Sequence, residues 1–275
     1  MKRAQEFFPT KPIIRLVATD LDGTLLLPDG TVSARTHAVL QRVQEAGVTV
    51  VLVSARPPRV LRQIAHALDI NGLAICCNGA LVYDLDSDTI VQHWPLSSTL
   101  ARRLVVTLRE ALPDLSFAGE CGLEFVCEPD FYRLSSLKGK ITMYIDDALS
   151  FCNQPLTKLI ALHSTCTVDE LHQCVVSLVG EEVIVTHSGA AFLEISAAGV
   201  TKASTLAALC GERGIASDEV VAFGDMPNDI SMLRWAGRGV AVANAHPQVL
   251  AGADEITHSN VEDGVALVLE RLLLS

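Results

Sequence analysis

Two carboxylates stand two residues apart directly after an apolar segment, in the stretch DLDGTL at residues 20–25. The apolar residues 13–19 predict a buried β-strand, and Gly23 allows the chain to turn sharply behind it. At the end of a parallel strand, such a turn opens into the crevice where α/β proteins bind ligands. There Asp20 could attack an electrophile or bind a metal while Asp22 moves a proton. An ordinary Asp-Gly turn would use the same residue types.

Other polar residues follow further apolar segments in the same way. They are Ser54 after residues 48–53, Asp225, Asn228 and Asp229 after residues 220–223, and Lys202 at the start of a helix predicted from residue 201. Each has a simpler interpretation, because Ser54, Asp225 and Asp229 are good helix caps and Lys202 could be a solvated helix residue. The ends of parallel strands share one edge of a sheet, so we expect these side chains to converge there.

The elements that would hold these residues alternate between strand and helix at both ends of the chain. The predicted strands are 13–19, 48–53, 73–77, 220–223 and 240–242, and the predicted helices are 33–45, 57–68, 201–213, 228–236, a short one after Pro247, and 261–273. The strands are continuous apolar runs, as in sheets buried on both faces. We therefore expect an α/β fold with a doubly wound, parallel, Rossmann-like core.

The middle of the chain has a different pattern, with shorter apolar segments. Strands are predicted at 123–126, 159–162, 183–185 and 192–195, and helices at 100–112 and 168–179. This pattern is typical of an α+β unit with an antiparallel sheet. We expect a discontinuous core of residues 13–84 and 197–275, an α+β insert of residues 85–196, and a loose tail of residues 1–12.

The composition of the chain excludes some classes of protein and of binding partner. The chain has 275 residues, 49% of them apolar, and a net charge of −11. The negative charge argues against a nucleic-acid backbone or an anionic membrane as the partner. No uncharged apolar segment approaches the ~20 residues that span a bilayer. The eight cysteines form no Cys-x-x-Cys pair, so we interpret them as buried, reduced thiols and expect a cytoplasmic monomer or small homo-oligomer.

Four stretches, taken together, resemble the haloacid dehalogenase superfamily of phosphatases, and within it the Cof-type branch with a large α/β cap. They are DLDGTLL at 20–26, VLVSAR at 51–56, GVTK at 199–202 and GDMPND at 224–229, with further similarity in NGA at 78–80 and ANA at 243–245. The resemblance covers nearly all of the chain after residue 12. The chain departs from it at Ala55 and Ala203, where glycine is usual or common, which could alter the detail of the pocket.

The resemblance implies a role for each acidic residue. Asp20 would be the nucleophile that forms an aspartyl-phosphate, and Asp22 would protonate the leaving alkoxide and later deprotonate the hydrolytic water. Mg²⁺ would bind the Asp20 carboxylate, the Asp22 backbone carbonyl and Asp225. Asp229 would orient Lys202 or a water on the metal.

The remaining implied contacts are with the phosphoryl group and the substrate. Ser54 would donate a hydrogen bond to the phosphoryl group, and Lys202 would neutralise its developing charge. The cap would close over the pocket, exclude water and contact the leaving group. Further candidate contacts are Leu21, Asn78, Gly79, Lys138 and Asn228.

Carboxylates as crowded as these cannot all ionise without compensation, which a divalent cation and Lys202 would supply. The resemblance therefore implies a Mg²⁺-dependent phosphatase of small phosphomonoesters, such as sugar phosphates or similar metabolites. A phosphomutase with the same intermediate is one alternative, and stoichiometric phosphate release would separate the two. A sensor that binds phosphate or another ligand without catalysis is the other, because a fold does not specify an activity.

Overall fold

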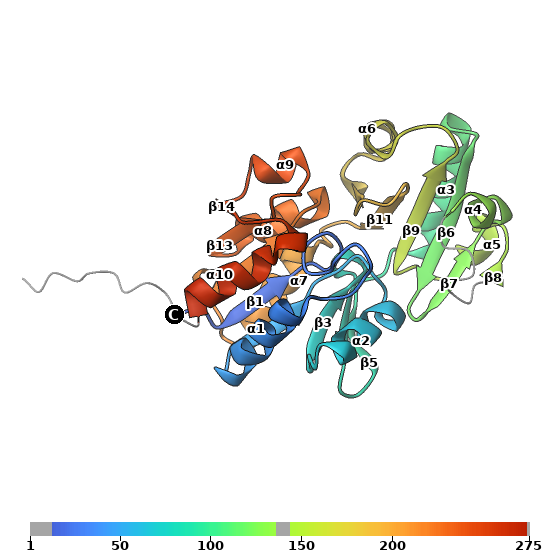
Figure 1. Cartoon of the computed structure of the whole chain (residues 1–275). Coiled ribbons are helices and arrows are strands. Elements are labelled where there is room, and N and C mark those ends of the chain that lie inside the picture. The colour runs from blue at the N-terminus through green and yellow to red at the C-terminus, as the bar shows by residue number, and fades with distance from the viewer. Residues whose placement is uncertain (1–12, 136–143, 274–275) are drawn as a thin grey trace, which may run out of the picture.

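The computed structural model describes residues 13–135 and 144–273. The expected tail of residues 1–12 and the candidate contact Lys138 lie outside these ranges. Figure 1 shows a core that contains both ends of the described chain, with the insert beside it. Within the described ranges, no helix has the length and apolar character needed to cross a membrane.

The core contains a sheet of five strands in the order β14-β13-β12-β1-β2, and all neighbouring strands run parallel. The strands are β1 (Leu16–Thr19), β2 (Thr49–Leu52), β12 (Val220–Gly224), β13 (Arg238–Ala241) and β14 (Glu255–Ile256). Thr19 pairs with both Leu52 and Phe223. The residues that follow β1, β2 and β12 therefore leave the sheet at the same edge, and the expected parallel core is confirmed.

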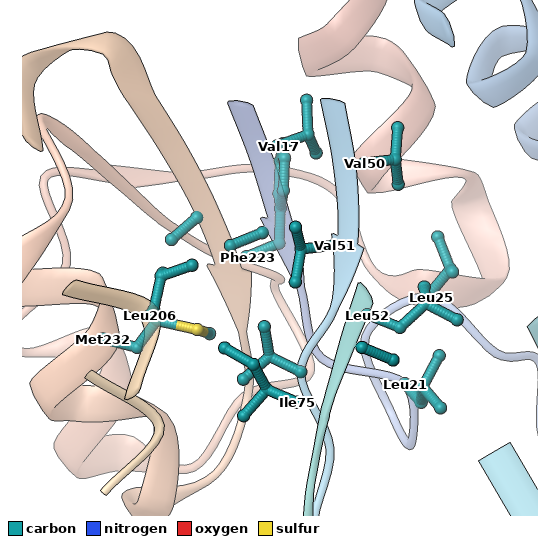
Figure 2. Close-up of a cluster of buried hydrophobic side chains, with 14 of the residues drawn as sticks. Val17, Leu21, Leu25, Val50, Val51, Leu52, Ile75, Leu206, Phe223 and Met232 are labelled. Carbon is teal, nitrogen blue, oxygen red and sulfur yellow. The ribbon is translucent and has the colours of Figure 1, made fainter. Parts of the chain in front are cut away.

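Helices cover the core sheet and bury its apolar strands. They are α1 (Ala34–Glu45), α2 (Pro58–Ala67), α7 (Lys202–Glu212), α8 (Ile230–Trp235), α9 (Pro247–Leu250) and α10 (Gly264–Leu273). In Figure 1, α1 and α10 lie in front of β1, and α7 lies behind it. Val17, Val51 and Phe223 are fully buried between these layers (Figure 2). Burial on both faces explains why the strands are continuous apolar runs.

The third predicted strand is followed by a hairpin rather than by a helix. Strand β3 (Leu73–Cys76) lies beside β2 through a parallel bridge between Val53 and Ile75. It then pairs with β4 (Leu81–Asp84), which pairs with β5 (Thr89–His93), both antiparallel.

This hairpin moves the first boundary of the insert. Residues 85–94, which we assigned to the insert, continue the core, because Ile90 and Trp94 pack against the core cluster. The Asp84 carboxylate accepts hydrogen bonds from two backbone amides of the turn, which closes the hairpin. The sequence shows this turn but not whether the chain pairs back on itself behind it.

The insert forms a six-stranded sheet in the order β10-β11-β9-β6-β7-β8, antiparallel except between β7 and β8. Its strands are β6 (Leu115–Cys121), β7 (Glu124–Cys127), β8 (Tyr144–Ile145), β9 (Lys158–His163), β10 (Val183–Thr186) and β11 (Leu193–Ala197). Its helices are α3 (Ser98–Ala111), α4 (Pro129–Leu134), α5 (Ala148–Phe151) and α6 (Val168–Val179). The expected α+β character is confirmed.

The two faces of the insert sheet have different neighbours. Leu159 and Ala161 of β9 pack in the same apolar cluster as side chains of α3 and α6. Lys158 and Ile160 alternate with them and line a cavity against the core. Because successive side chains of a strand point to opposite faces, β9 presents one face to its helices and the other to the core.

Candidate active site

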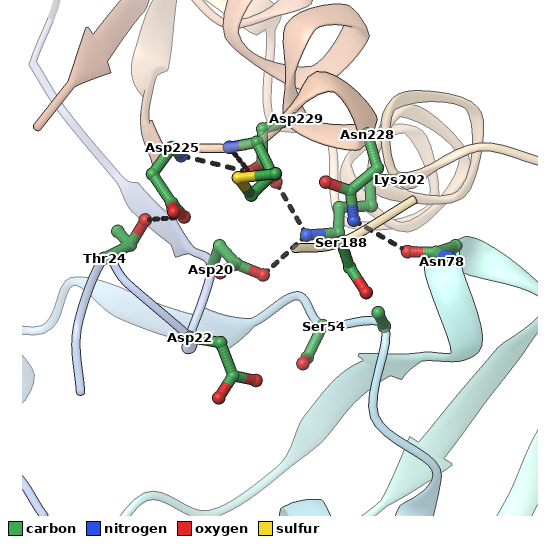
Figure 3. A network of polar contacts seen from close by, with 12 residues as sticks. Asp20, Asp22, Thr24, Ser54, Asn78, Ser188, Lys202, Asp225, Asn228 and Asp229 are labelled. Carbon is green, nitrogen blue, oxygen red and sulfur yellow. Dashed lines mark hydrogen bonds and ion pairs between the residues drawn. The ribbon is translucent and has the colours of Figure 1, made fainter. Parts of the chain in front are cut away.

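Side chains from three separate elements meet at the shared strand edge (Figure 3). Asp20 follows β1, Asp225 follows β12, and Lys202 opens α7. The buried ammonium of Lys202 donates hydrogen bonds to Asp20 Oδ1 at 2.5 Å and to Asp229 Oδ1 at 2.6 Å. The structure therefore brings together four of the residues singled out from the sequence.

Asp225 and Asp229 are held by further hydrogen bonds. Thr24 Oγ1 donates to Asp225 Oδ1 at 2.7 Å, a contact that the sequence did not indicate. Asp229 Oδ2 accepts from the backbone amides of Asp225 at 3.1 Å and Met226 at 3.0 Å. Asp229 therefore caps this turn and binds Lys202 at the same time.

Gly23 is required by the close approach of Asp225. Its φ angle is +78°, and a Cβ atom placed on it would lie 2.3 Å from Asp225 Oδ2. A side chain at this position would both strain the backbone and displace the carboxylate.

The site contains more carboxylates than ammonium groups, and this shifts the pKa values of its residues. Burial raises the pKa of Asp20 well above its ordinary value, and the nearby Asp229 and Asp225 add to this while Lys202 opposes it. Burial, followed by the charge of Asp229, raises the pKa of Asp225 to about 7. Burial opposes the charge of Lys202, but Asp20 and Asp229 outweigh it and raise the pKa of the lysine. One ammonium among three buried carboxylates leaves a net negative charge.

This donor set fits a hard divalent cation. One oxygen from each of Asp20, Asp225 and Asp229 lies within 4.8 Å of the others, and Mg²⁺ prefers oxygen ligands. The hydrogen bonds to Lys202 and Thr24 involve Oδ1 of Asp20 and Oδ1 of Asp225. The Oδ2 atoms of these two residues therefore remain available to a cation, whereas both oxygens of Asp229 accept hydrogen bonds.

Asp22 points to a different partner from the other acids. Its carboxylate forms a two-pronged ion pair with Arg56, with Nε to Oδ2 at 2.6 Å and Nη2 to Oδ1 at 2.5 Å. The Asp22 side chain is 46% exposed and lines the cavity between core and insert. The sequence analysis placed Arg56 in a motif but gave it no role, because its partner Asp22 lies 34 residues away in the chain.

Ser54 is buried and its Oγ accepts a hydrogen bond from the Arg56 amide at 3.1 Å. The simpler interpretation, in which Ser54 bonds amides that follow it, is therefore part of the structure. Accepting that bond leaves the hydroxyl hydrogen able to donate elsewhere.

The other candidate contacts lie around this centre. Asn228 Nδ2 donates to Asn78 Oδ1 at 2.9 Å, and the Asn78 side chain also interacts with the Glu194 carboxylate. Gly79 accepts from Thr205 at 2.7 Å and so packs against α7, the helix that carries Lys202. The Leu21 side chain is buried in the core, so only its backbone can face a ligand.

A cavity of about 1040 Å³ lies between the core and the insert. Its lining includes Asp22, Arg56 and Asp225 from the core. Six more charged residues of the described chain line this cavity and were missed from the sequence: Arg59, Arg62, Glu120, Glu124, Lys158 and Glu194. They come from five different elements, so no local motif could have indicated them.

Residues 17–269 match the family of haloacid dehalogenase-like hydrolases, and the chain belongs to this family. The resemblance drawn from the four sequence stretches is thereby confirmed. A solved haloacid dehalogenase-like hydrolase from Bacteroides thetaiotaomicron is similar in fold, with a TM-score of 0.78 and 30% sequence identity over 94% of this chain and 100% of that one.

Curated relatives match along nearly their whole length. The chain is 30% identical over 270 residues to pyridoxal phosphate phosphatase YbhA of Escherichia coli, covering 92% of this chain and 96% of the relative. It is 27% identical over 267 residues to 5-amino-6-(5-phospho-D-ribitylamino)uracil phosphatase YcsE of Bacillus subtilis, covering 95% of this chain and 96% of the relative.

Proposed function

We propose that the protein is a Mg²⁺-dependent phosphatase that hydrolyses small phosphomonoesters through an aspartyl-phosphate. The observation that carries this proposal is the buried cluster in which Lys202 bonds both Asp20 and Asp229 beside Asp225. A sensor needs only to bind its ligand, whereas this cluster combines a nucleophile, a cation site and a fixed ammonium. The names of the curated relatives, which are phosphatases of small metabolites, support the same conclusion.

In this mechanism a carboxylate oxygen of Asp20 forms the new bond to phosphorus while the bond to the leaving oxygen breaks. Both oxygens of Asp22 accept from Arg56 in this structure, so Asp22 would first take up a proton from solvent in the cavity and then give it to that oxygen. Asp22 then takes a proton from the water that hydrolyses the aspartyl-phosphate. Ser54 donates a hydrogen bond to the phosphoryl group, and Lys202 neutralises the charge that develops there.

Asp20, Asp225 and the backbone carbonyl of Asp22 would hold Mg²⁺, and Asp229 would orient Lys202. The bound ion supplies positive charge that stabilises the transferred phosphoryl group. We assign further phosphate or substrate contacts to the backbone of Leu21 and to Asn78, Gly79 and Asn228.

The substrate would be a small phosphorylated metabolite, such as a sugar phosphate or a similar compound, enclosed between the core and the insert acting as a cap. The cavity has room for such a leaving group. We also propose a cytoplasmic location, as a monomer or small homo-oligomer. Burial raises the pKa of the Cys76 thiol and raises that of Cys77 to about 12, which supports unreactive thiols at these two positions. The expectation that all the cysteines are buried is wrong for Cys166 and Cys174, which are exposed.

The test is a phosphate-release screen with Mg²⁺ over sugar phosphates, nucleotides and pyridoxal phosphate. We expect the wild-type protein to release phosphate stoichiometrically from at least one compound, which excludes a mutase. Asp20→Asn removes the nucleophile and should lower the rate at least about a thousandfold. Equal release by both proteins would refute the assignment of Asp20.

A further inference from the structure

The loop that carries Ser54 and Arg56 is held from two sides. The carbonyl oxygens of Ser54 and Arg56 accept hydrogen bonds, each at 3.1 Å, from backbone amides of the core turn 77–79. The carbonyl oxygen of Ala55, between them, accepts from the ammonium of Lys158 at 2.8 Å. Lys158 belongs to β9 of the insert. The middle of this core loop is therefore anchored by the insert.

Burial and an ion pair hold the charged ammonium of Lys158 in place at the Ala55 carbonyl. It is 3% exposed and forms an ion pair with Glu194, which is 1% exposed. Glu194 also accepts a hydrogen bond from Ser188 at 2.7 Å. Burial opposes the charge on Lys158, but Glu194, Cys77 and Glu120 together outweigh it and raise the pKa of the lysine, so the ammonium stays charged.

Folding of the insert alone does not explain this pair. A buried ion pair is often no more stabilising than apolar residues of similar volume. An apolar pair at these positions in β9 and β11 could not donate to a carbonyl of the core. The ammonium of Lys158 therefore has a role that apolar packing cannot replace, which is to donate a hydrogen bond to the core.

A second contact joins the same two units without touching this loop. Arg59 of α2 donates to both carboxylate oxygens of Glu120 in β6, at 2.7 and 2.9 Å. Both residues line the same cavity. Breaking this pair would weaken closure of the insert without removing the donor to the Ala55 carbonyl. Glu120 also lies opposite Lys158 in the register of β6 and β9 and adds to the negative charge around it.

We propose that Lys158 is a positioning residue through which closure of the insert fixes the loop of Ser54 and Arg56. The contact sets the position of the Ser54 hydroxyl and of the Arg56 guanidinium that holds Asp22. The loop is fully anchored only when the insert lies over the cavity, so closure and readiness for catalysis are coupled. This inference rests on the phosphatase function proposed above.

The kinetic test uses the double variant Lys158→Met/Glu194→Gln, which removes both charges and leaves no unpaired carboxylate. With p-nitrophenyl phosphate, we expect kcat to fall about 10- to 100-fold, as for a small displacement of catalytic groups, with KM changed less than about threefold. Lys158→Arg keeps a charged donor and should recover most of kcat. Arg59→Met/Glu120→Gln should change KM more than kcat. A double variant with wild-type kcat would overturn the proposal.

Hydrogen–deuterium exchange provides a second readout that does not require activity. The Ser54 amide donates to the Ile75 carbonyl at 2.9 Å, and the Arg56 amide donates to Ser54 Oγ at 3.1 Å. Peptides covering residues 54–57 should exchange at least about fivefold faster in Lys158→Met/Glu194→Gln than in Arg59→Met/Glu120→Gln. Equal exchange in the two variants would refute the positioning role. If the wild-type protein released no phosphate, the proposed function would fail while this comparison still decided the role of Lys158.

Discussion

Lys202 is the residue on which the charge balance of the site depends. Its ammonium lies between Asp20 and Asp229 and is fully buried with them. Without it, the two carboxylates would face each other and Asp225 in a medium of low polarity. Removing one partner of a buried ion pair is far more harmful than replacing the whole pair.

Lys202→Met should therefore lower the free energy of unfolding by about 3–5 kcal/mol, measured by urea denaturation. It should also reduce phosphate release at least about a hundredfold, because the charge on the phosphoryl group is no longer neutralised. Adding Asp229→Asn should restore part of the stability and none of the activity. Near wild-type activity in the single variant would contradict this role.

The turn after β1 is the element that sets the distance between Asp20 and Asp225. Its backbone continues the pairing of the sheet, since the Asp20 amide donates to the Phe223 carbonyl at 3.0 Å. Gly23 then turns with positive φ beneath the Asp225 carboxylate. The parallel register places the two acids at one edge, and the glycine lets them approach.

Gly23→Ala and Gly30→Ala form a matched pair that tests this turn. Both glycines have positive φ, +78° and +83°, but no atom of the described residues lies within 4 Å of a Cβ placed on Gly30. Each substitution should destabilise the fold by about 1–2 kcal/mol through backbone strain. Only Gly23→Ala should also weaken Mg²⁺ binding, at least about tenfold, because it displaces Asp225. Equal Mg²⁺ affinities by calorimetry would show that the approach is not required.

The buried carboxylates should make the stability of the entire protein depend on pH when no cation is bound. Without metal, the pKa of Asp225 rises from 3.8 to about 7 and that of Asp20 also rises. The folded state then holds a proton on Asp225 that the unfolded state releases between about pH 4 and 7. The contribution of these groups to the free energy of unfolding therefore falls as pH rises through that window.

Mg²⁺ should offset this loss by replacing the protons. We expect the rise in Tm on replacing EDTA with Mg²⁺ to be several degrees at pH 8 and much smaller at pH 5. Differential scanning calorimetry of wild type and Asp225→Asn measures it, and the variant should respond little at either pH. A larger Mg²⁺ effect at pH 5 would contradict the assignment of these carboxylates.

Much of the architecture and the cluster of Asp20, Lys202, Asp225 and Asp229 could be predicted from local sequence patterns. Ser33 caps α1 as expected, with its side chain accepting from the Thr36 amide at 3.0 Å. The residues after β1 and β12 meet as predicted, because the order of strands in a parallel sheet brings their ends together. Apolar periodicity, helix caps and glycine turns each involve only a few neighbouring residues, so they can be recognised in the sequence.

The cavity between the core and the insert is formed by residues that are distant in the sequence. The hydrogen bond from Lys158 to Ala55 spans 103 positions, and the pair of Arg59 and Glu120 spans 61. Nothing near any of these residues indicates its partner, because packing of the insert on the core selects which charges face each other. Local sequence patterns therefore determined the helices and strands and the cluster of acidic residues. The tertiary packing of the two sheets determined which residues line the cavity.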